Sequence, residues 1–172
     1  MHTGSSQVLN VSIEYKPYEE RTFAVLDSWG SARQMVRDVG CPNLGITLDF
    51  CHMLMKKENP AFAASLLLKE DKLFGIHLND GEGSVDDGLM VGAVNPWKLI
   101  ELYYYLKAYG YQGIIYFDTF PKRESAVSEA TMNIAVCRKV ESLVSRIGLE
   151  RISRIISQRD SVSAMEMLYS LI

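Results

Sequence analysis

Short apolar runs alternate along the chain with longer segments in which apolar residues recur at helical spacing. The apolar runs predict four β-strands, over residues 8–16, 44–50, 73–79 and 113–118. The longer segments predict helices at about residues 27–39, 60–69, 95–109 and 125–147, with a glycine at position 40, 110 or 148 where a helix should end. This alternation is typical of an α/β fold whose parallel strands are joined by helical crossovers.

Each predicted strand has, at or within two residues of its end, a polar residue that can bind a metal. These residues are Glu14, Asp49, His77 and Asp118, which lie 35, 28 and 41 residues apart. An eight-unit β/α barrel of about 250 residues has about 31 residues per unit, so the spacing favours such a barrel. Four units are only half of it, and four strands cannot close into a barrel. We therefore expect residues 1–148 to form the C-terminal half of a (β/α)8 TIM barrel, and residues 149–172 to add a short helical appendage.

The four strand ends should meet at one edge of the sheet, because parallel strands place their carboxyl ends together. Each ending has a simpler interpretation by itself, since a terminal Asp often caps the following helix. Several carboxylates at one place repel each other unless a cation joins them. Three carboxylates and one imidazole suit Mn²⁺, with Mg²⁺ or Co²⁺ as possible ions and Zn²⁺ less favoured.

Other polar residues lie near these endings. Lys16 is two residues after Glu14, so the two side chains share a face of the strand, although such pairs are commonly solvated surface pairs. His52 is three residues after Asp49 and is either a site residue or a structural histidine. The segment 81–88 is an acidic, glycine-rich loop that is either a surface turn or a source of ligands for a second ion; its acids are Glu82, Asp86 and Asp87.

Composition argues against several classes of protein. The chain has 172 residues, a net charge of −3 and no basic run, which argues against a nucleic-acid partner. No apolar run approaches the roughly 18 residues of a membrane span. Three cysteines without metal-binding spacing fit a reducing cytoplasm better than a disulfide framework. The first seven residues are either a natural tail or an expression remnant.

Four motifs together resemble a known family: IEYKP from residue 13, LDFCH from residue 48, HLND from residue 77 with DDGL from residue 86, and YFDTFP from residue 116. From about residue 11 to 147 the chain resembles the C-terminal half of the xylose-isomerase-like TIM-barrel superfamily, nearest to its L-rhamnose isomerase and sugar isomerase branch. The resemblance implies a first metal, which also holds the sugar hydroxyls, at Glu14, Asp49, His77 and Asp118. It also implies a second, catalytic metal at His52 and Asp86. Gly88 stands where the family often has another acid, which removes one ligand from the second site.

The resemblance further implies aldose–ketose isomerisation by a metal-assisted hydride shift between C1 and C2 of an open-chain sugar. Lys16 would contact the sugar's carbonyl end and stabilise charge there. The catalytic residues that the resemblance implies are Lys16, His52 and Asp118. The expected substrate contacts are Glu14, Lys16 and His52. Core packing is favoured over sugar packing for the aromatic residues Tyr18, Phe50, Trp97 and Phe120.

Three alternatives stay open. A ketose 3-epimerase uses one metal and two glutamates, but this chain has Asp118 at the fourth strand and carries Lys16, which is typical of the isomerases. The chain could also be a fragment that is inactive until a missing N-terminal half-barrel or a second copy completes it. A metal-dependent endonuclease is disfavoured, because only His52 and His77 are available for its metal cluster. The expected partners are therefore a small sugar and another half-barrel, without nucleic acid or membrane, and the sugar's identity is left open.

Overall fold

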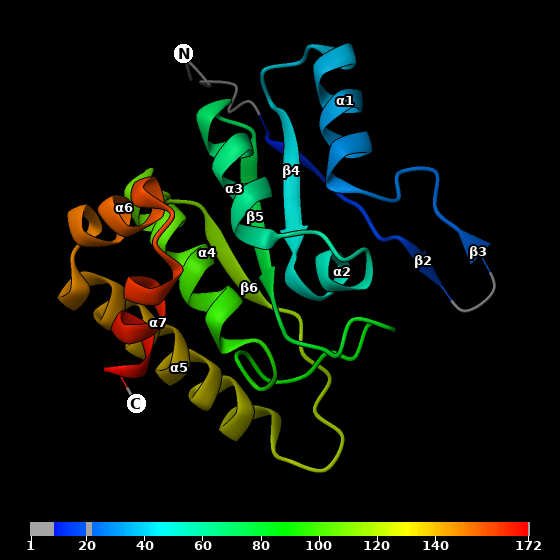
Figure 1. Cartoon of the computed structure of the whole chain (residues 1–172). Helices are drawn as coiled ribbons and strands as arrows, with labels where there is room; N and C mark the ends of the chain where they lie inside the picture. The colour runs from blue at the N-terminus through cyan, green and yellow to red at the C-terminus, as the bar shows by residue number, and fades with distance from the viewer. Residues whose placement is uncertain (1–8, 20–21, 172) are drawn as a thin grey trace, which may run out of the picture.

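The computed structural model describes residues 9–19 and 22–171. Four parallel strands form its main sheet in the order β1 (Val11–Glu14), β4 (Leu44–Asp49), β5 (Leu73–Leu78) and β6 (Ile114–Phe117) (Figure 1). This confirms the predicted α/β fold with a parallel sheet. The first strand is shorter than predicted and ends before Lys16, while its predicted start at Val8 and the first seven residues lie outside the described part.

Helices α1 (Trp29–Val39), α3 (Pro60–Lys69) and α4 (Pro96–Ala108) pack along one side of this sheet (Figure 1). The strand residues that face them are buried and apolar: Ile46, Leu48, Ile76 and Leu78. No helix covers the other side of the sheet among the residues that the structure describes. That side is the inner face of the predicted half-barrel, and it holds a hollow of about 490 Å³ lined by residues that include Ser12, Thr47, Phe74, His77, Ile114 and Tyr116.

Helix boundaries follow from local chemistry. Asn59 caps α3 by accepting a hydrogen bond from the Phe62 N–H, and Pro60 occupies the first helical position, where its missing N–H costs nothing. Helix α1 ends at Gly40, whose φ of 67° lies in the left-handed region that favours glycine. The predicted ranges for α3, α4 and α5 (Ala126–Ile147) agree with the structure to within a residue at each end.

Three elements, one helix and two strands, were not predicted. Helix α2 (Phe50–Met55) begins directly after β4, so the predicted strand 44–50 is one residue too long and Phe50 belongs to a helix. Strands β2 (Tyr18–Glu19) and β3 (Thr22–Phe23) form a small antiparallel ribbon that projects away from the main sheet (Figure 1). The ribbon carries the chain from β1 to α1.

The C-terminal segment forms α6 (Leu149–Gln158) and α7 (Ser161–Tyr169), as the amphipathic pattern predicts. Ile152 of α6 and Met167 of α7 are buried in the same apolar core as Val144 of α5. Among the described residues, none of the helices has both the length and the apolar character needed to cross a membrane.

Candidate metal centre

The four predicted ligands come together at the carboxyl edge of the sheet. Asp49 and His77 are register partners on β4 and β5, and Glu14 pairs with Thr47, two residues before Asp49. Asp118 follows β6 directly, and its N–H donates to the Leu78 carbonyl at 3.2 Å. One donor atom from each of Glu14, Asp49, His77 and Asp118 lies within 4.8 Å of all the others.

His77 lies between two of the carboxylates. Its Nδ1 is 3.1 Å from Oε1 of Glu14 and 3.7 Å from Oδ2 of Asp118. The side chains of Glu14, His77 and Asp118 are about one-quarter to one-third exposed, so the cluster opens toward solvent at the barrel mouth. A bound ion or a substrate can therefore reach these three side chains.

Asp49 is the buried member of the cluster. Its carboxylate is fully buried, accepts the His52 N–H at 2.9 Å as the N-cap of α2, and accepts two contacts from the Asn79 amide at 3.0 and 3.3 Å. Burial raises the pKa of Asp49 to about 6, although His52 and Asn79 act in the opposite direction. A buried carboxylate with a raised pKa calls for a compensating positive charge, so this donor set fits a divalent cation.

Asn79 itself is fixed on both sides. Its side-chain oxygen accepts the Cys51 N–H at 2.8 Å while its amide nitrogen donates to Asp49. Asn79 was not among the residues that the sequence predicted for the site. The structure shows that it orients the carboxylate of Asp49.

A second polar group joins Lys16, His52 and Asp86. The Lys16 ammonium donates to Oδ2 of Asp86 at 2.9 Å, and Nε2 of His52 lies 3.3 Å from the same oxygen. Nδ1 of His52 faces the Tyr15 carbonyl at 2.9 Å. The structure therefore brings together the three residues that were predicted to flank the first four.

Charge–charge contacts control ionisation in this second group. Burial by itself would raise the pKa of Asp86, but hydrogen bonds from His52 and Lys16 lower it to about 2. Burial by itself would lower the pKa of His52, and the carboxylates of Asp86 and Asp49 raise it instead. The pKa of Lys16 is likewise raised, since contacts with Glu19 and Asp86 outweigh its partial burial.

The loop that carries Asp86 is anchored by Asp80. The fully buried Asp80 carboxylate accepts hydrogen bonds from the backbone of Gly81, Val94 and Asn95 and from the Asn95 amide, at 2.7 to 2.9 Å. These contacts join the two ends of the loop. Sequence reasoning missed this role of Asp80, although its position directly after Asn79 at a strand end is a signal for it.

Two further acids of the loop lie outside both groups. Glu82 is exposed, which favours its interpretation as part of a surface turn. Oδ2 of Asp87 accepts the Glu82 N–H at 2.8 Å. Neither side chain belongs to the four-residue cluster.

Tyr15 connects the end of β1 to the core. Its ring is buried, and its hydroxyl donates to Glu58 at 2.5 Å. Burial raises the pKa of Tyr15, and the Glu58 carboxylate raises it further. Because Tyr15 lies between Glu14 and Lys16 in sequence, this anchor holds both of them at the mouth.

The aromatic candidates separate into two kinds. Phe50 is buried in the core, as expected, whereas Trp97 and Phe120 are each 43% exposed. Tyr18 is partly buried, and its hydroxyl donates to the Ser84 carbonyl at 2.6 Å. The expectation of core packing is thus correct for Phe50 and wrong for Trp97 and Phe120.

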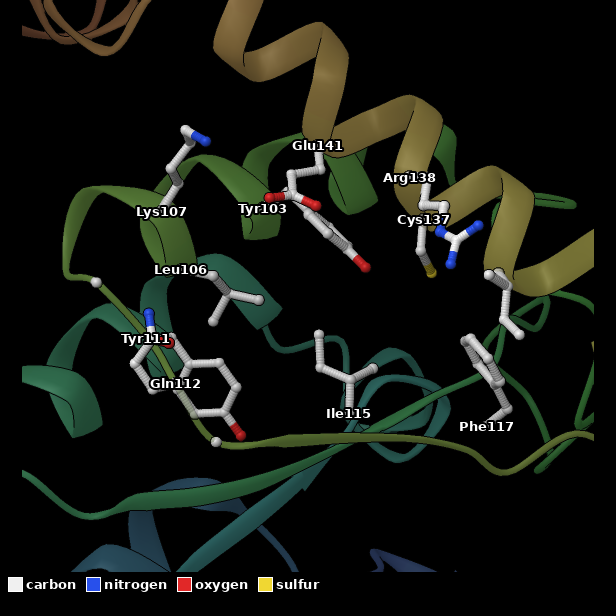
Figure 2. Close-up of a pocket in the computed structure, with 13 residues that line it drawn as sticks. Tyr103, Leu106, Lys107, Tyr111, Gln112, Ile115, Phe117, Cys137, Arg138 and Glu141 are labelled. Carbon is white, nitrogen blue, oxygen red and sulfur yellow. The ribbon is translucent and has the colours of Figure 1, made fainter.

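A larger hollow of about 620 Å³ lies between α4, β6 and α5 (Figure 2). Figure 2 shows Cys137, Arg138 and Glu141 of α5 facing Ile115 and Phe117 of β6 across it. None of the predicted site residues lines this space. It is separate from the metal cluster and marks a region where α5 stands away from the sheet.

The family model for the xylose isomerase-like TIM barrel matches residues 7–136. The chain therefore belongs to this family, in agreement with the resemblance of its motifs, and its sheet is part of a TIM barrel. No curated protein matches the chain at a significant level.

Several solved structures share the fold. A D-tagatose 3-epimerase-like protein is 24% identical with a TM-score of 0.62, over 80% of this chain and 48% of the other. A xylose isomerase domain protein from Alicyclobacillus acidocaldarius subsp. acidocaldarius is 22% identical with a TM-score of 0.62, over 79% and 52%. A D-psicose 3-epimerase solved with D-fructose is 19% identical with a TM-score of 0.56, over 78% and 48%. The chain thus spans about half the length of these proteins.

Proposed function

We propose that the chain is the metal-binding half of a divalent-metal-dependent sugar isomerase that interconverts aldoses and ketoses. The observation that carries the proposal is the convergence of four donor atoms within 4.8 Å, with Lys16 two residues after the end of β1. Membership of the xylose isomerase-like family supports a sugar as the substrate.

In this proposal Glu14, Asp49, His77 and Asp118 hold the ion, and Mn²⁺ is the ion that the set favours. Carboxylates suit hard cations, and a single imidazole is better accommodated by Mn²⁺ than by Mg²⁺ or Ca²⁺. Co²⁺ and Mg²⁺ remain candidates for the assay, and Zn²⁺ is less favoured. When bound, the ion would supply Lewis-acid polarisation of the sugar's oxygens.

The chain's own residues then orient and polarise the sugar. Glu14 is one-third exposed at the mouth, where its carboxylate can also accept a sugar hydroxyl. The Lys16 ammonium stabilises negative charge as it develops on the carbonyl oxygen. His52 contacts the Asp86 carboxylate and lies with it beside the substrate. Asp118 both binds the ion and contacts the reacting part of the sugar.

A second candidate is 3-epimerisation of a ketose. Glu14 and Asp118 are two partly exposed carboxylates within 3.7 Å of the same His77 nitrogen, a pair that can act as base and acid at one carbon. Two of the structures with the same fold are described as a D-tagatose 3-epimerase-like protein and a D-psicose 3-epimerase. Reaction in D₂O separates the two activities, because proton transfer introduces solvent deuterium into the product and a hydride shift does not.

The sugar pocket needs more than the described sheet. Within the described residues β1 and β6 each pair with a single strand, so the barrel needs about four further βα units to close. We propose that a complementary half-barrel, or a second copy of this chain, supplies them.

We also propose that the protein is cytoplasmic. The free thiols of all three cysteines fit that reducing compartment.

The proposal is tested first by metal binding. We expect Asp49→Asn to weaken Mn²⁺ binding by more than about 100-fold in calorimetry, since it removes the buried charge of the cluster. Asp71→Asn is the matched control, because Asp71 is exposed and lies before β5, at the opposite end of that strand from His77. Equal affinity in the Asp49 variant and the parent would reject the site.

The activity is tested next. The parent is assayed with a panel of aldoses and ketoses, alone and with a complementary half-barrel.

A further inference from the structure

The second metal position implied by the resemblance has too few ligands. In the described part of the chain, the only group of at least three His, Cys, Asp or Glu side chains with converging donor atoms is Glu14, Asp49, His77 and Asp118. His52 and Asp86 contribute two side chains, and Nδ1 of His52 already faces the Tyr15 carbonyl at 2.9 Å. Catalytic metal sites normally have about three protein ligands.

A cationic side chain already occupies this place. The Lys16 ammonium lies 2.9 Å from Oδ2 of Asp86, the oxygen that also faces His52 at 3.3 Å, and 2.8 Å from Oε1 of Glu19. Lys16 and Asp86 are mostly buried, with side chains 28% and 11% exposed. A divalent ion at this carboxylate would meet the ammonium at close range and be repelled.

The missing third ligand is excluded by packing. Gly88 has a φ of +56°, and a Cβ built on it would lie 2.2 Å from the ring of Phe120. The Phe120 N–H also donates to the Gly88 carbonyl at 2.8 Å, which fixes the two segments against each other. An acidic side chain at position 88 would require both a strained backbone and displacement of this ring.

One atom of the group remains available. Oδ1 of Asp86 is buried and has no hydrogen-bond partner among the described residues. A single acceptor oxygen beside an ammonium group suits one hydroxyl group, which donates to the carboxylate and accepts from the lysine.

We infer that the site binds one divalent ion, and that the Lys16 ammonium takes the place of a second ion at His52 and Asp86, where Oδ1 of Asp86 receives a sugar hydroxyl. The inference rests on the proposed function for the first ion. It moves Asp86 from metal binding to substrate binding and keeps Lys16 as a substrate contact.

Metal stoichiometry tests it on the intact chain. Mn²⁺ is titrated by calorimetry, and bound manganese is counted by elemental analysis after dialysis. We expect one ion per chain in the parent and in Asp86→Asn, with dissociation constants that agree within about threefold because Asp86 does not contact the ion. Two ions in the parent, or loss of the single ion in Asp86→Asn, would overturn the inference while leaving a metal-dependent function intact. No ion in the parent would instead reject the metal centre on which the proposed function depends.

Two lysine variants test the role of the ammonium. Lys16→Met removes the charge and keeps an apolar stem, and we expect it to bind a second, weaker Mn²⁺. Lys16→Arg keeps the charge and should bind one ion only. A single ion in Lys16→Met would show that the ammonium does not take the second ion's place. Circular dichroism of each variant confirms that the fold is retained.

Discussion

Asn79 holds the carboxylate of Asp49 without belonging to the four side chains that converge on the proposed ion. Its amide nitrogen donates to both Asp49 oxygens, and its oxygen accepts from Cys51 at the start of α2. The Asp49 carboxylate is fully buried, so these contacts help to keep it ionised and correctly turned. We therefore expect Asn79 to affect metal affinity by fixing the orientation of the Asp49 carboxylate.

We predict that Asn79→Ala weakens Mn²⁺ binding by about 10- to 100-fold, the range seen when a partner of a metal ligand is removed. Calorimetric titration measures the change. Asn59→Ala is the control: it removes the cap of α3 and costs about 1 kcal/mol of unfolding free energy, but it should leave the metal affinity unchanged. Similar affinities for the parent and the Asn79 variant would show that Asp49 is oriented by other contacts.

Single site residues could be predicted from the sequence where a polar residue lies at the end of a predicted strand. Glu14, Asp49, His77 and Asp118 could be found because parallel strands bring their carboxyl ends together. The contact between Lys16 and Asp86 joins residues 70 positions apart and depends on how one loop folds over the mouth. Nothing in the local pattern shows that the ammonium and His52 meet at the same oxygen of Asp86.

Among the elements, those with strong caps were predicted best. Helix α3 begins after Asn59 and at Pro60, two residues that define a helix start from sequence. Helix α2 was missed because the apolar run of β4 continues without interruption into it, and a short apolar run does not distinguish strand from helix. Asp49 is both the last residue of β4 and the N-cap of α2. No residue between the two elements therefore marks the boundary in the sequence.

The loop between β5 and α4 depends on the single buried carboxylate of Asp80. Asp80→Asn replaces one acceptor oxygen with a donor and leaves backbone N–H groups without partners, so we predict a loss of about 3 kcal/mol in unfolding free energy. Urea denaturation measures the loss, and hydrogen exchange should increase across residues 81–95. In Asp38→Asn, the exposed control, stability should change by less than about 0.5 kcal/mol. An unchanged exchange rate in the loop would mean that Asp80 does not anchor it.

For the whole molecule, the main consequence of the fold is an open sheet. Strands β1 and β6 have one partner each within the described residues, and the inner face exposes Ile114 and Tyr116, which are 73% and 57% accessible. Unpaired edges and exposed apolar side chains promote association with another chain. This feature could be predicted from the sequence by counting βα units, but the identity of the partner could not, because an unpaired edge and an apolar face suit more than one partner.

We therefore predict that the purified chain associates through its inner face. Sedimentation should give a mass above the 19.4 kDa of one chain, and Ile114→Lys should return it toward that value, because a charge on this face opposes burial. Since Ile114 is already exposed, the substitution should change unfolding free energy by less than about 0.5 kcal/mol. Val127→Lys places the same charge on α5, at a position that is 77% exposed, and should leave the mass unchanged. A monomeric parent, or equal effects of the two lysines, would show that the inner face does not drive association between copies of this chain.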